Sequence, residues 1–359
     1  MRPPCEAVVA VTGMNATDNP APGVAVCRSL RAVPEFRGQV VGLGYDALDP
    51  GFYAQGLLDA GAILPYPKAG RLAMLERLRA LRSELGIDVL LPTLDSELRA
   101  VAASERELAE LGIACFVPRL DALAAAAKAR LPELAGRGGF RTPDSEAVGH
   151  AEAVRTLVDR LGLPLVVKGV FYGATIVHSE ADAVLAFHHF AASWGLPVIV
   201  QRYVAGEEYN VAALGDGEGG LVGAVAMRKM ALTDKGKGWS GVTVDGPDLL
   251  RTTGALVDAL GWRGGLEVEF LRERATGELY VLEVNPRFPA WVYLATGAGQ
   301  NLPWAYVMLA CGEPVPELPP YRVGTQFVRI SLDQIQDLST YGALSASGRF
   351  GSVGVRRAS

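Results

Sequence analysis

Residues 266–287 hold two apolar segments with acidic side chains at alternate positions, Leu266-Glu-Val-Glu-Phe-Leu271 and Tyr280-Val-Leu-Glu-Val-Asn-Pro-Arg287. Side chains alternate between the two faces of a strand, so Glu267 and Glu269 share one face. By the same rule Glu283 and Asn285 share a face, and a turn near Thr276 places Glu269 opposite Glu283. Facing carboxylates among apolar residues repel each other and are costly to desolvate. The pattern predicts an antiparallel hairpin with one acidic face.

The acidic face has two interpretations. A divalent cation removes the repulsion, and two Glu carboxylates with an Asn carbonyl are oxygen ligands that suit Mg²⁺ or Mn²⁺ carrying water and phosphate oxygens. Arg287 follows within reach and can neutralise a phosphoryl group in transfer. A solvated hairpin with its charges in water explains the same pattern, because a single polar face is common in antiparallel sheets. The pattern alone leaves both interpretations open.

The composition argues against several classes of protein. The chain has 359 residues, half of them hydrophobic, and a net charge of −5 without a basic stripe or tail, so nucleic acid is not an expected partner. No apolar run approaches the roughly 20 residues that span a bilayer, so no membrane partner is expected. Four cysteines lie far apart with no paired or metal-type spacing, which predicts reduced thiols in a cytoplasmic protein. A homodimer is the default oligomeric state.

The first third of the chain alternates short apolar strands with amphipathic helices. Strands are expected at 7–11, 39–44, 61–64, 87–91 and 113–117, and helices at 23–32, 71–85 and 96–111. This order predicts a parallel, doubly wound sheet with helices on both faces. Ligands of such sheets bind beyond the carboxyl ends of the strands, so the loops at 12–22 and 92–97 are expected to border a site. No G-x-G-x-x-G follows the first strand, which argues against a nicotinamide-dependent oxidoreductase.

The pattern changes beyond residue 118. An alanine-rich helix is expected to carry Lys128, and a glycine-containing stretch follows it. Strands of more antiparallel character are expected at 164–168, 174–178, 197–203, 209–214, 220–228 and 240–245, with helices at 179–192, 247–260 and 291–311. The final segment, 313–359, has four prolines and weak periodicity, and its last dozen residues are expected to be disordered.

Two further segments carry groups that suit a nucleotide. Lys168 ends an apolar strand beside a glycine-containing loop, so its ammonium can reach phosphate oxygens while loop amides cover them. The backbone of residues 202–204 follows another apolar strand and can hydrogen-bond adenine, and a carboxylate at 207 or 208 can hold the ribose hydroxyls. Taken alone, each segment has a commoner explanation, which is a surface lysine at a strand end for the first and an ordinary strand-turn-strand for the second.

In this order, these residues resemble the ATP-grasp superfamily over roughly residues 1–312. The most specific piece is Glu269 … Glu283-Val-Asn285-Pro-Arg287, which is close to the E…E-x-N-x-R of biotin carboxylase and the carbamoyl-phosphate synthetase large subunit. The resemblance implies an α/β and α+β protein in which two α+β subdomains sandwich ATP. It divides the chain into a doubly wound pre-ATP-grasp domain at 1–118, a small subdomain with a linker helix at 119–206, a C-terminal subdomain with the metal site at 207–312 and an extension at 313–359.

The resemblance also implies a set of site residues. Lys128 and Lys168 would contact the ATP phosphates, Gln201, Tyr203 and Val204 would hold adenine, and Glu208 would hold the ribose. Glu269, Glu283 and Asn285 would bind two Mg²⁺ or Mn²⁺ ions. Arg287, Arg228 and Lys168 would act on the γ-phosphate or the substrate, and the loop Thr12-Gly-Met-Asn15 would help frame the acceptor pocket. Lys235 and Lys237 belong either to this site or to a solvated loop.

The reaction that the resemblance implies is an ATP-dependent ligation. A substrate carboxylate would attack the γ-phosphorus to give an acyl phosphate and ADP, and an amine or a thiol would then displace phosphate. The expected partners are a small-molecule or peptide carboxylate and an amine acceptor. Phe288-Pro-Ala-Trp291 stands where relatives often have small residues, so the acceptor pocket is expected to be unusual, with Trp291 as one wall. A non-catalytic nucleotide sensor, and a carboxylase or carbamoyl-phosphate-type enzyme using bicarbonate, are the alternatives.

Overall fold

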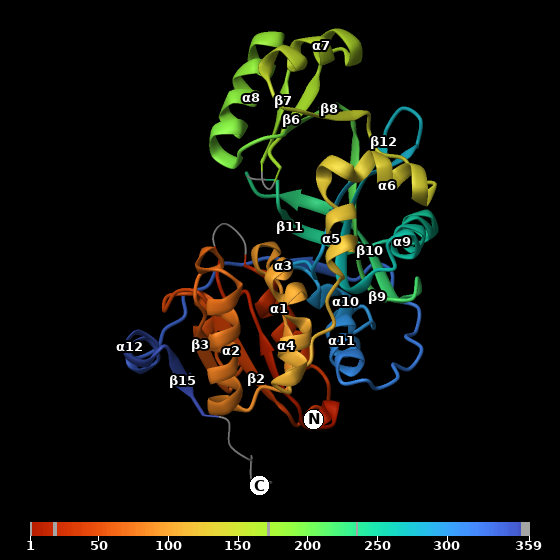
Figure 1. The fold of residues 1–359 in the computed structure, drawn as a ribbon. Coiled ribbons are helices and arrows are strands. Elements are labelled where there is room, and N and C mark those ends of the chain that lie inside the picture. Colours follow the sequence, from red (N-terminus) through yellow and green to blue (C-terminus); the bar gives the residue numbers. More distant parts are fainter. Residues whose placement is uncertain (1, 17–19, 171–172, 235, 353–359) are drawn as a thin grey trace.

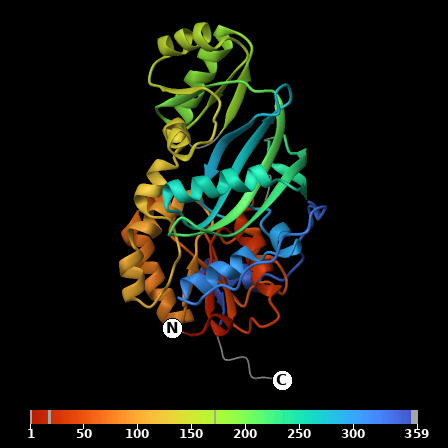
Figure 2. The same cartoon turned by 90° about the vertical axis from the view of Figure 1, so that its right-hand side faces the viewer.

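Three sheets and their helices make up the fold in the computed structural model, which describes residues 2–16, 20–170, 173–234 and 236–352 (Figure 1). An N-terminal α/β unit lies at one end and a small α+β lid at the other, with a long antiparallel sheet between them, as the view turned by 90° also shows (Figure 2). Within the described ranges no helix is long and apolar enough to cross a membrane. The mixed α/β and α+β class predicted from the sequence is confirmed.

The N-terminal sheet has the strand order β15-β3-β2-β1-β4, and β1 to β4 are parallel. Its strands are β1 (Val8–Val11), β2 (Gln39–Gly44), β3 (Ala60–Ile63), β4 (Val89–Leu91) and β15 (Arg349–Gly351). Helix α1 (Pro22–Arg31) covers one face, and α2 (Arg71–Leu85), α3 (Asp95–Ala103) and α4 (Glu105–Glu110) cover the other. Because β1, β2 and β4 are buried on both faces, their sequences are continuous apolar runs. The fifth strand expected at 113–117 is reduced to one bridge between Val89 and Ala114.

The lid is a four-stranded antiparallel sheet of order β5-β8-β6-β7. Its strands are β5 (Ser145–Val148), β6 (Leu165–Lys168), β7 (Ala174–Val177) and β8 (Val198–Arg202), and its helices are α7 (Ala151–Leu161) and α8 (Glu180–Trp194). Alternate residues of β6 and β8 pack with both helices in one hydrophobic cluster. The helices therefore cover one face of the lid. The intervening residues of β6 and β8, whose side chains point the other way, form its other face.

The central sheet is antiparallel throughout, with the order β13-β12-β9-β10-β11-β14. Its strands are β9 (Gly206–Asp216), β10 (Leu221–Leu232), β11 (Gly238–Thr243), β12 (Arg263–Glu273), β13 (Leu279–Asn285) and β14 (Gln326–Val328). One face packs against α5 (Leu120–Ala125), α6 (Leu131–Gly138) and α9 (Pro247–Leu260). The opposite face packs against α10 (Tyr293–Gly297) and α11 (Leu302–Ala310) next to the N-terminal unit. We call this second face the site face, because the polar residues described below lie on it.

Several helices differ from the sequence prediction. The one expected at 96–111 is two helices, α3 and α4, and α7 was not predicted. The helix expected at 291–311 is split into α10 and α11, because Gly299 has φ 111° and Asn301 begins the second helix by accepting a hydrogen bond from the Trp304 amide at 3.1 Å. The alanine-rich helix ends at Ala125, and Lys128 is the first residue of a short 3-10 helix, Lys128–Arg130.

The C-terminal segment is more ordered than its sequence indicated. Strand β14 extends the central sheet beside β11, and after α12 (Ser339–Ser347) strand β15 pairs with β3 in the N-terminal sheet. The Phe350 ring lies edge-on to Phe52 with 5.9 Å between centroids. The prediction of disorder was therefore wrong for residues 349–351, since strands of three residues are too short to give a periodic pattern. Residues 353–359 lie outside the described ranges.

Candidate active site

The acidic hairpin lies on the site face of the central sheet. Glu267 pairs with Asn285 and Glu269 pairs with Glu283 across β12 and β13, which confirms the register predicted from the sequence. The alternate residues Leu266, Val268 and Phe270 are fully buried in the core that α9 covers. Because neighbouring residues of a strand point to opposite faces, burying these three directs the glutamates to the other face. The solvated-hairpin interpretation is wrong for Glu267, which is only 5% exposed.

Besides Arg287, which is described below, three hydrogen-bond donors hold Glu267 in place. The Asn210 amide and the Trp291 indole each donate to Oε1 at 2.7 Å, and Asn285 Nδ2 donates to Oε2 at 3.1 Å. Burial and the neighbouring charge of Glu269 raise the pKa of Glu267. Trp291, expected as a wall of the acceptor pocket, is buried beneath the carboxylates, where it positions Glu267.

Lys128 and Lys168 approach Glu283 from different parts of the chain. Lys128 Nζ lies 3.0 Å from Glu283 Oε1. Burial raises the pKa of Glu283, although Lys128 opposes this shift. Lys168 lies with Gln201 on the face of the lid that α7 and α8 leave open, since their chain neighbours Val167 and Val200 pack under those helices. Burial lowers the pKa of Lys168 and the charge of Glu283 opposes that shift, so the lid brings this ammonium toward the hairpin.

Lys229 neutralises the other side of the acidic hairpin. Its ammonium lies 2.6 Å from Glu208 Oε2 and 3.5 Å from Glu269 Oε2. Burial alone would lower the pKa of Lys229, but Glu269 and Glu208 outweigh it and raise the pKa. Burial alone would likewise raise the pKa of Glu269, but Lys229 and Arg287 outweigh it and the pKa is lowered. Glu269 and Lys229 therefore both stay charged at neutral pH.

Arg287 joins the central sheet to the N-terminal unit. Its Nε lies 3.4 Å from Oδ2 of Asp95, the first residue of α3, and its Nη1 lies 3.4 Å from Glu267 Oε2. Burial alone would lower the pKa of Arg287, but Asp95 and Glu267 outweigh it and raise the pKa. The guanidinium is thus permanently charged and is shared between two carboxylates.

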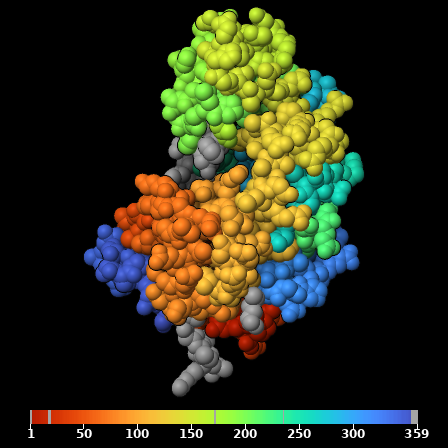
Figure 3. Space-filling view, viewed as in Figure 1, coloured from red at the N-terminus to blue at the C-terminus, as the bar shows by residue number. Residues whose placement is uncertain are grey.

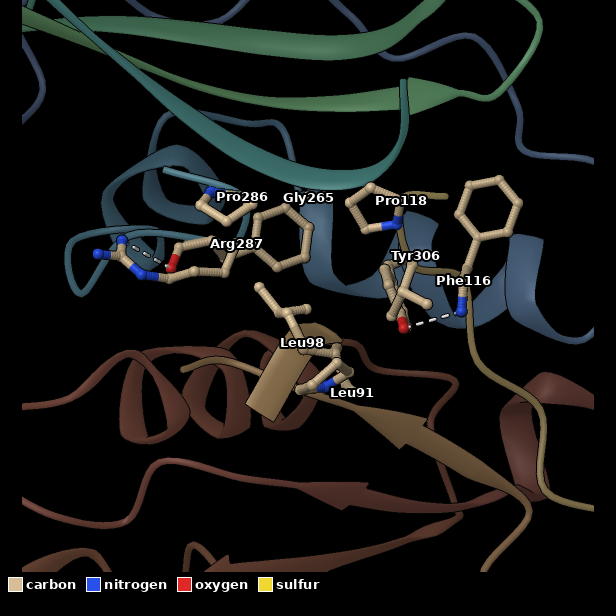
Figure 4. A pocket seen from close by; sticks show the side chains of 11 residues that line it. Leu91, Leu98, Phe116, Pro118, Gly265, Pro286, Arg287 and Tyr306 are labelled. Atoms are coloured by element: carbon tan, nitrogen blue, oxygen red, sulfur yellow. Dashed lines mark hydrogen bonds between the residues drawn. The ribbon is translucent and has the colours of Figure 1, made fainter. Parts of the chain in front are cut away.

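A small cavity lies beside the stem of Arg287, between β4, α11 and the central sheet (Figure 4). Its volume is about 10 Å³, and Leu98, Phe116, Phe288 and Tyr306 are among its lining residues. Such a volume holds about one water molecule, so no substrate fits there. The Arg287 stem is packed in an apolar wall, which fixes the direction of its guanidinium.

Arg228 is the predicted residue that the structure does not bring into this cluster. Val225 and Met227 pack on the site face, and Ala224 and Ala226 pack on the opposite face, so alternation puts Lys229 on the site face and Arg228 on the other. Arg228 is exposed, and its nearest carboxylate is Glu207 at 3.9 Å. The structure therefore favours Lys229 over Arg228 for the contact expected with the γ-phosphate or the substrate.

The segment expected to hold adenine connects the lid to the central sheet. Gln201 is buried at the end of β8, and Tyr203 and Val204 lie between β8 and β9. Val204 packs with Leu271 and Tyr280 in a small cluster at this joint. Glu208 follows on β9 and pairs with Lys229. The position between two sheets agrees with an adenine-binding joint, and the individual roles stay predictions.

The metal prediction rests on few protein ligands. Among the described residues, no three His, Cys, Asp or Glu side chains converge as a metal-binding group. Glu269 and Glu283 face each other across the hairpin, and Asn285 donates through Nδ2 to Glu269 and Glu267, which directs its Oδ1 to other partners. Two carboxylates and one amide oxygen fit Mg²⁺, which usually keeps water and phosphate oxygens as its remaining ligands.

Two cations near the site were not predicted. Lys229 could have been found from the alternation of buried residues along β10. Arg329 follows β14, where its Nε donates to the Gly238 carbonyl at 3.0 Å and its guanidinium lies 5.3 Å from the centre of the Phe327 ring. Burial lowers the pKa of Arg329 to about 10, and the negative charge of Glu267 opposes this shift. No sequence signal marked Arg329, because its strand is three residues long.

These two neighbouring basic residues give a matched pair of variants. Lys229→Met is expected to lower ATP turnover by about 10²-fold or more, because a charge-balancing donor at a phosphoryl site is lost. Arg228→Met, one residue away and on the opposite face, is expected to stay within about threefold of wild type because surface charges contribute little. The readout is ADP release at saturating ATP, with the melting temperature of each variant as a folding control. Equal losses in both variants would contradict the assignment.

The space between the lid and the N-terminal unit is open to solvent. The space-filling view shows the surface hollowed between these two parts (Figure 3). Lys168 on the lid and the carboxylates of Glu283 and Glu269 on the central sheet are close enough to influence one another's charge, although they come from different elements. Charged groups of both signs therefore meet where the lid approaches the central sheet.

Known proteins resemble this chain in sequence and in fold. The family model described as "ATP-grasp in the biosynthetic pathway with Ter operon" matches residues 196–331. The D-alanine–D-alanine ligase of Chromohalobacter salexigens is 36% identical over 92 residues, which cover 25% of this chain and 29% of that protein. The carbamoyl phosphate synthase large chain of Clostridium beijerinckii is 26% identical over 210 residues, covering 54% of this chain and 18% of that protein. The chain thus spans under a third of the length of these relatives.

A solved structure of biotin carboxylase from Campylobacter jejuni, in complex with an ATP species, superposes with a TM-score of 0.71 at 16% identity, covering 89% of this chain and 74% of that one. A lid sheet and a central antiparallel sheet that face each other beside an N-terminal α/β unit define the ATP-grasp fold. Together with the sequence matches, this fold confirms the resemblance to the ATP-grasp superfamily that the sequence predicted.

Proposed function

We propose that this protein is an ATP-dependent ligase that joins a carboxylate to an amine through an acyl phosphate. The observation that carries the proposal is the paired charge on the site face, where Glu269 and Glu283 face each other and are balanced by Lys229 and Lys128. Buried carboxylates facing each other are unfavourable unless a cation binds between them. A phosphoryl-transfer site needs this combination of metal ligands and fixed positive groups.

The proposed chemistry begins with transfer of the γ-phosphoryl group. A carboxylate oxygen of the substrate attacks the γ-phosphorus, the bond to the bridging oxygen breaks, and ADP leaves. Lys128, Lys168 and Arg287 stabilise the charge in transfer, which is the main protein contribution to such reactions. Magnesium held by Glu269, Glu283 and Asn285 would neutralise the phosphate oxygens. An amine then attacks the acyl carbon, loses a proton and displaces phosphate.

The nucleotide is proposed to lie between the lid and the central sheet. Gln201, Tyr203 and Val204 lie at the joint between these parts, which suits adenine, and Glu208 follows on β9, where it can receive the ribose. Glu208 is engaged by Lys229 in this structure, so ribose binding requires these two side chains to share or exchange partners. The acceptor pocket is proposed beside Arg287 and the loop Thr12-Gly-Met-Asn15.

The proposal extends to partners and location. A small-molecule or peptide carboxylate and an amine acceptor are the proposed substrates, and a homodimer is the proposed assembly. A reducing, cytoplasmic location agrees with the four cysteines, which are all free thiols. Burial raises the pKa of Cys27 and of Cys115 to about 12, so neither thiol is reactive at neutral pH.

Mg²⁺-dependent ADP release tests the proposal directly. The protein is incubated with ATP and a panel of carboxylic acids, and hydroxylamine replaces the unknown amine. We expect ADP together with a hydroxamate, because hydroxylamine traps the acyl phosphate and identifies the carboxylate. AMP as the product would indicate adenylation and overturn the mechanism. ADP that depends on bicarbonate alone would favour the carboxylase alternative, and ATP binding without turnover for any acid would favour the nucleotide sensor.

A further inference from the structure

Two tyrosine rings stack at the carboxyl edge of the N-terminal sheet. Tyr45 follows β2 directly and Tyr66 lies three residues after β3, and their ring centroids are 5.7 Å apart with 20° between the planes. Tyr45 is half-buried, whereas Tyr66 is 52% exposed. The Tyr66 ring is therefore supported by Tyr45 and open to solvent elsewhere. It lies on the edge of a doubly wound sheet where ligands bind.

The backbone around Tyr66 is rigid. Pro65 and Pro67 flank it, and Pro67–Ala69 form a 3-10 helix that begins directly after Tyr66. Proline fixes the φ angle of its own residue and restricts the residue before it. Lys68 Nζ lies 5.8 Å from the centre of the Tyr66 ring. A ring held this way loses little conformational entropy when a ligand stacks on it, so it is pre-organised for binding.

The first turn of α3 connects the tyrosine pair to the charged residues around Arg287. The Tyr45 hydroxyl donates to Glu97 Oε2 at 2.5 Å, and the amides of Thr93 and Leu94 donate to Glu97 Oε1 at 3.0 and 3.1 Å. Asp95, on the same turn, binds Arg287. The turn that positions Tyr45 therefore also carries the carboxylate that pairs with the proposed phosphoryl-binding arginine.

Folding explains Tyr45 but does not explain Tyr66. Tyr45 packs on the core between the sheet and α2 to α4, and its hydroxyl has a buried acceptor. Tyr66 keeps about half of its surface in water, so it gains little from burial. A large ring that is held between two prolines and stacked on Tyr45 at the carboxyl edge of the sheet presents a free face on which a planar group can stack.

We propose that the acceptor pocket extends along this edge and that Tyr66, supported by Tyr45, stacks on a planar ring of the substrate. The inference rests on the proposed ligase function. Three strand spacings of about 4.8 Å separate β3 from β4, so roughly 14 Å lies between the strand ends that carry Tyr66 and the Asp95–Arg287 pair. The substrate class is then an elongated molecule with an aromatic or heteroaromatic ring at one end and the reacting carboxylate or amine at the other.

Binding of two matched probes tests this inference without requiring turnover. The probes are N-benzoylglycylglycine and its saturated counterpart, N-cyclohexanecarbonylglycylglycine, titrated by calorimetry into the protein with MgADP present. Wild type is expected to bind the aromatic probe about tenfold more tightly, because stacking on a tyrosine adds to apolar contact. Tyr66→Phe is expected to keep this preference and Tyr66→Ala to lose it.

Leu72→Ala, which truncates another exposed apolar side chain at the start of α2, is the control and is expected to keep the preference. The melting temperature and the MgADP affinity are expected to match wild type in all three variants. Equal binding of the two probes by wild type, or an unchanged preference in Tyr66→Ala, would overturn the stacking role. Failure of the hydroxamate assay with normal probe discrimination would instead count against the ligase chemistry, so the two failures are distinguishable.

Discussion

Glu283→Gln is expected to lower ATP turnover by at least ~10³-fold, about 4 kcal/mol in the barrier, while the protein stays folded. Glutamine keeps the shape of the side chain and one oxygen, but it removes the charge that a hard divalent cation requires from its carboxylate ligands. It also removes the partner of Lys128, which lies 3.0 Å away. The substitution relieves the repulsion between Glu283 and Glu269, so no large loss of stability is expected. ADP release and thermal unfolding measure the two effects.

Glu278→Gln provides the matched control on the same hairpin. Glu278 lies at the turn end and accepts hydrogen bonds from Arg141 and from the Tyr280 hydroxyl at the surface. Its charge lies outside the paired cluster, so the control is expected to stay within about twofold of wild-type turnover. If Glu283→Gln released ADP at the wild-type rate and melted normally, the metal-ligand role of Glu283 would be wrong.

The hairpin was predictable because its pattern is local. Alternation along two strands and one turn fixed which glutamates share a face and which face each other. The same rule, applied to the buried residues of β10, would have selected Lys229 over Arg228. The parallel N-terminal sheet was also predictable, since strands buried on both faces are continuous apolar runs.

Contacts between distant parts of the chain were not predictable in the same way. Trp291 reaches Glu267 because α10 packs beneath the hairpin, and Asp95 reaches Arg287 because α3 begins at the edge of the N-terminal sheet that meets the central sheet. Neither pair has a spacing or periodicity that one sequence reveals. The short strands β14 and β15 fall below the length at which alternation is detectable, so Arg329 gave no signal.

The stacked tyrosines are another contact that one sequence does not reveal, here at the edge proposed to bind the substrate. Tyr45 and Tyr66 follow different strands, and only the parallel order of β2 and β3 brings their rings together. The proposed metal ligands come from one hairpin, whereas the proposed acceptor pocket would be assembled from loops that follow several strands. The sequence therefore predicts a class of chemistry but no particular substrate.

Arg287→Met is expected to lower hydroxamate formation by about 10³-fold while changing the KM for ATP by less than about threefold. Asp95 and Glu267 keep the guanidinium charged, and its apolar stem is fixed in the wall of a cavity with room for one water. A cation fixed this way needs no reorganisation when charge develops on the transferred phosphoryl group, so its loss acts on the transition state more than on nucleotide binding. Arg287→Lys is expected to recover part of the activity, because lysine restores the positive charge but lacks the planar guanidinium that can donate two parallel hydrogen bonds.

A structural role for Arg287 would give a different result. Arg287 also connects the N-terminal unit to the central sheet through its ion pair with Asp95. Loss of this connection alone could slow the reaction. Asp95→Asn removes that ion pair but leaves the guanidinium beside Glu267 at 3.4 Å. We expect Asp95→Asn to lose no more than about fivefold, since a partly exposed pair contributes little. If Asp95→Asn lost as much activity as Arg287→Met, Arg287 would act as a tie between two parts of the protein, and the phosphoryl-stabilising role would have to be given up.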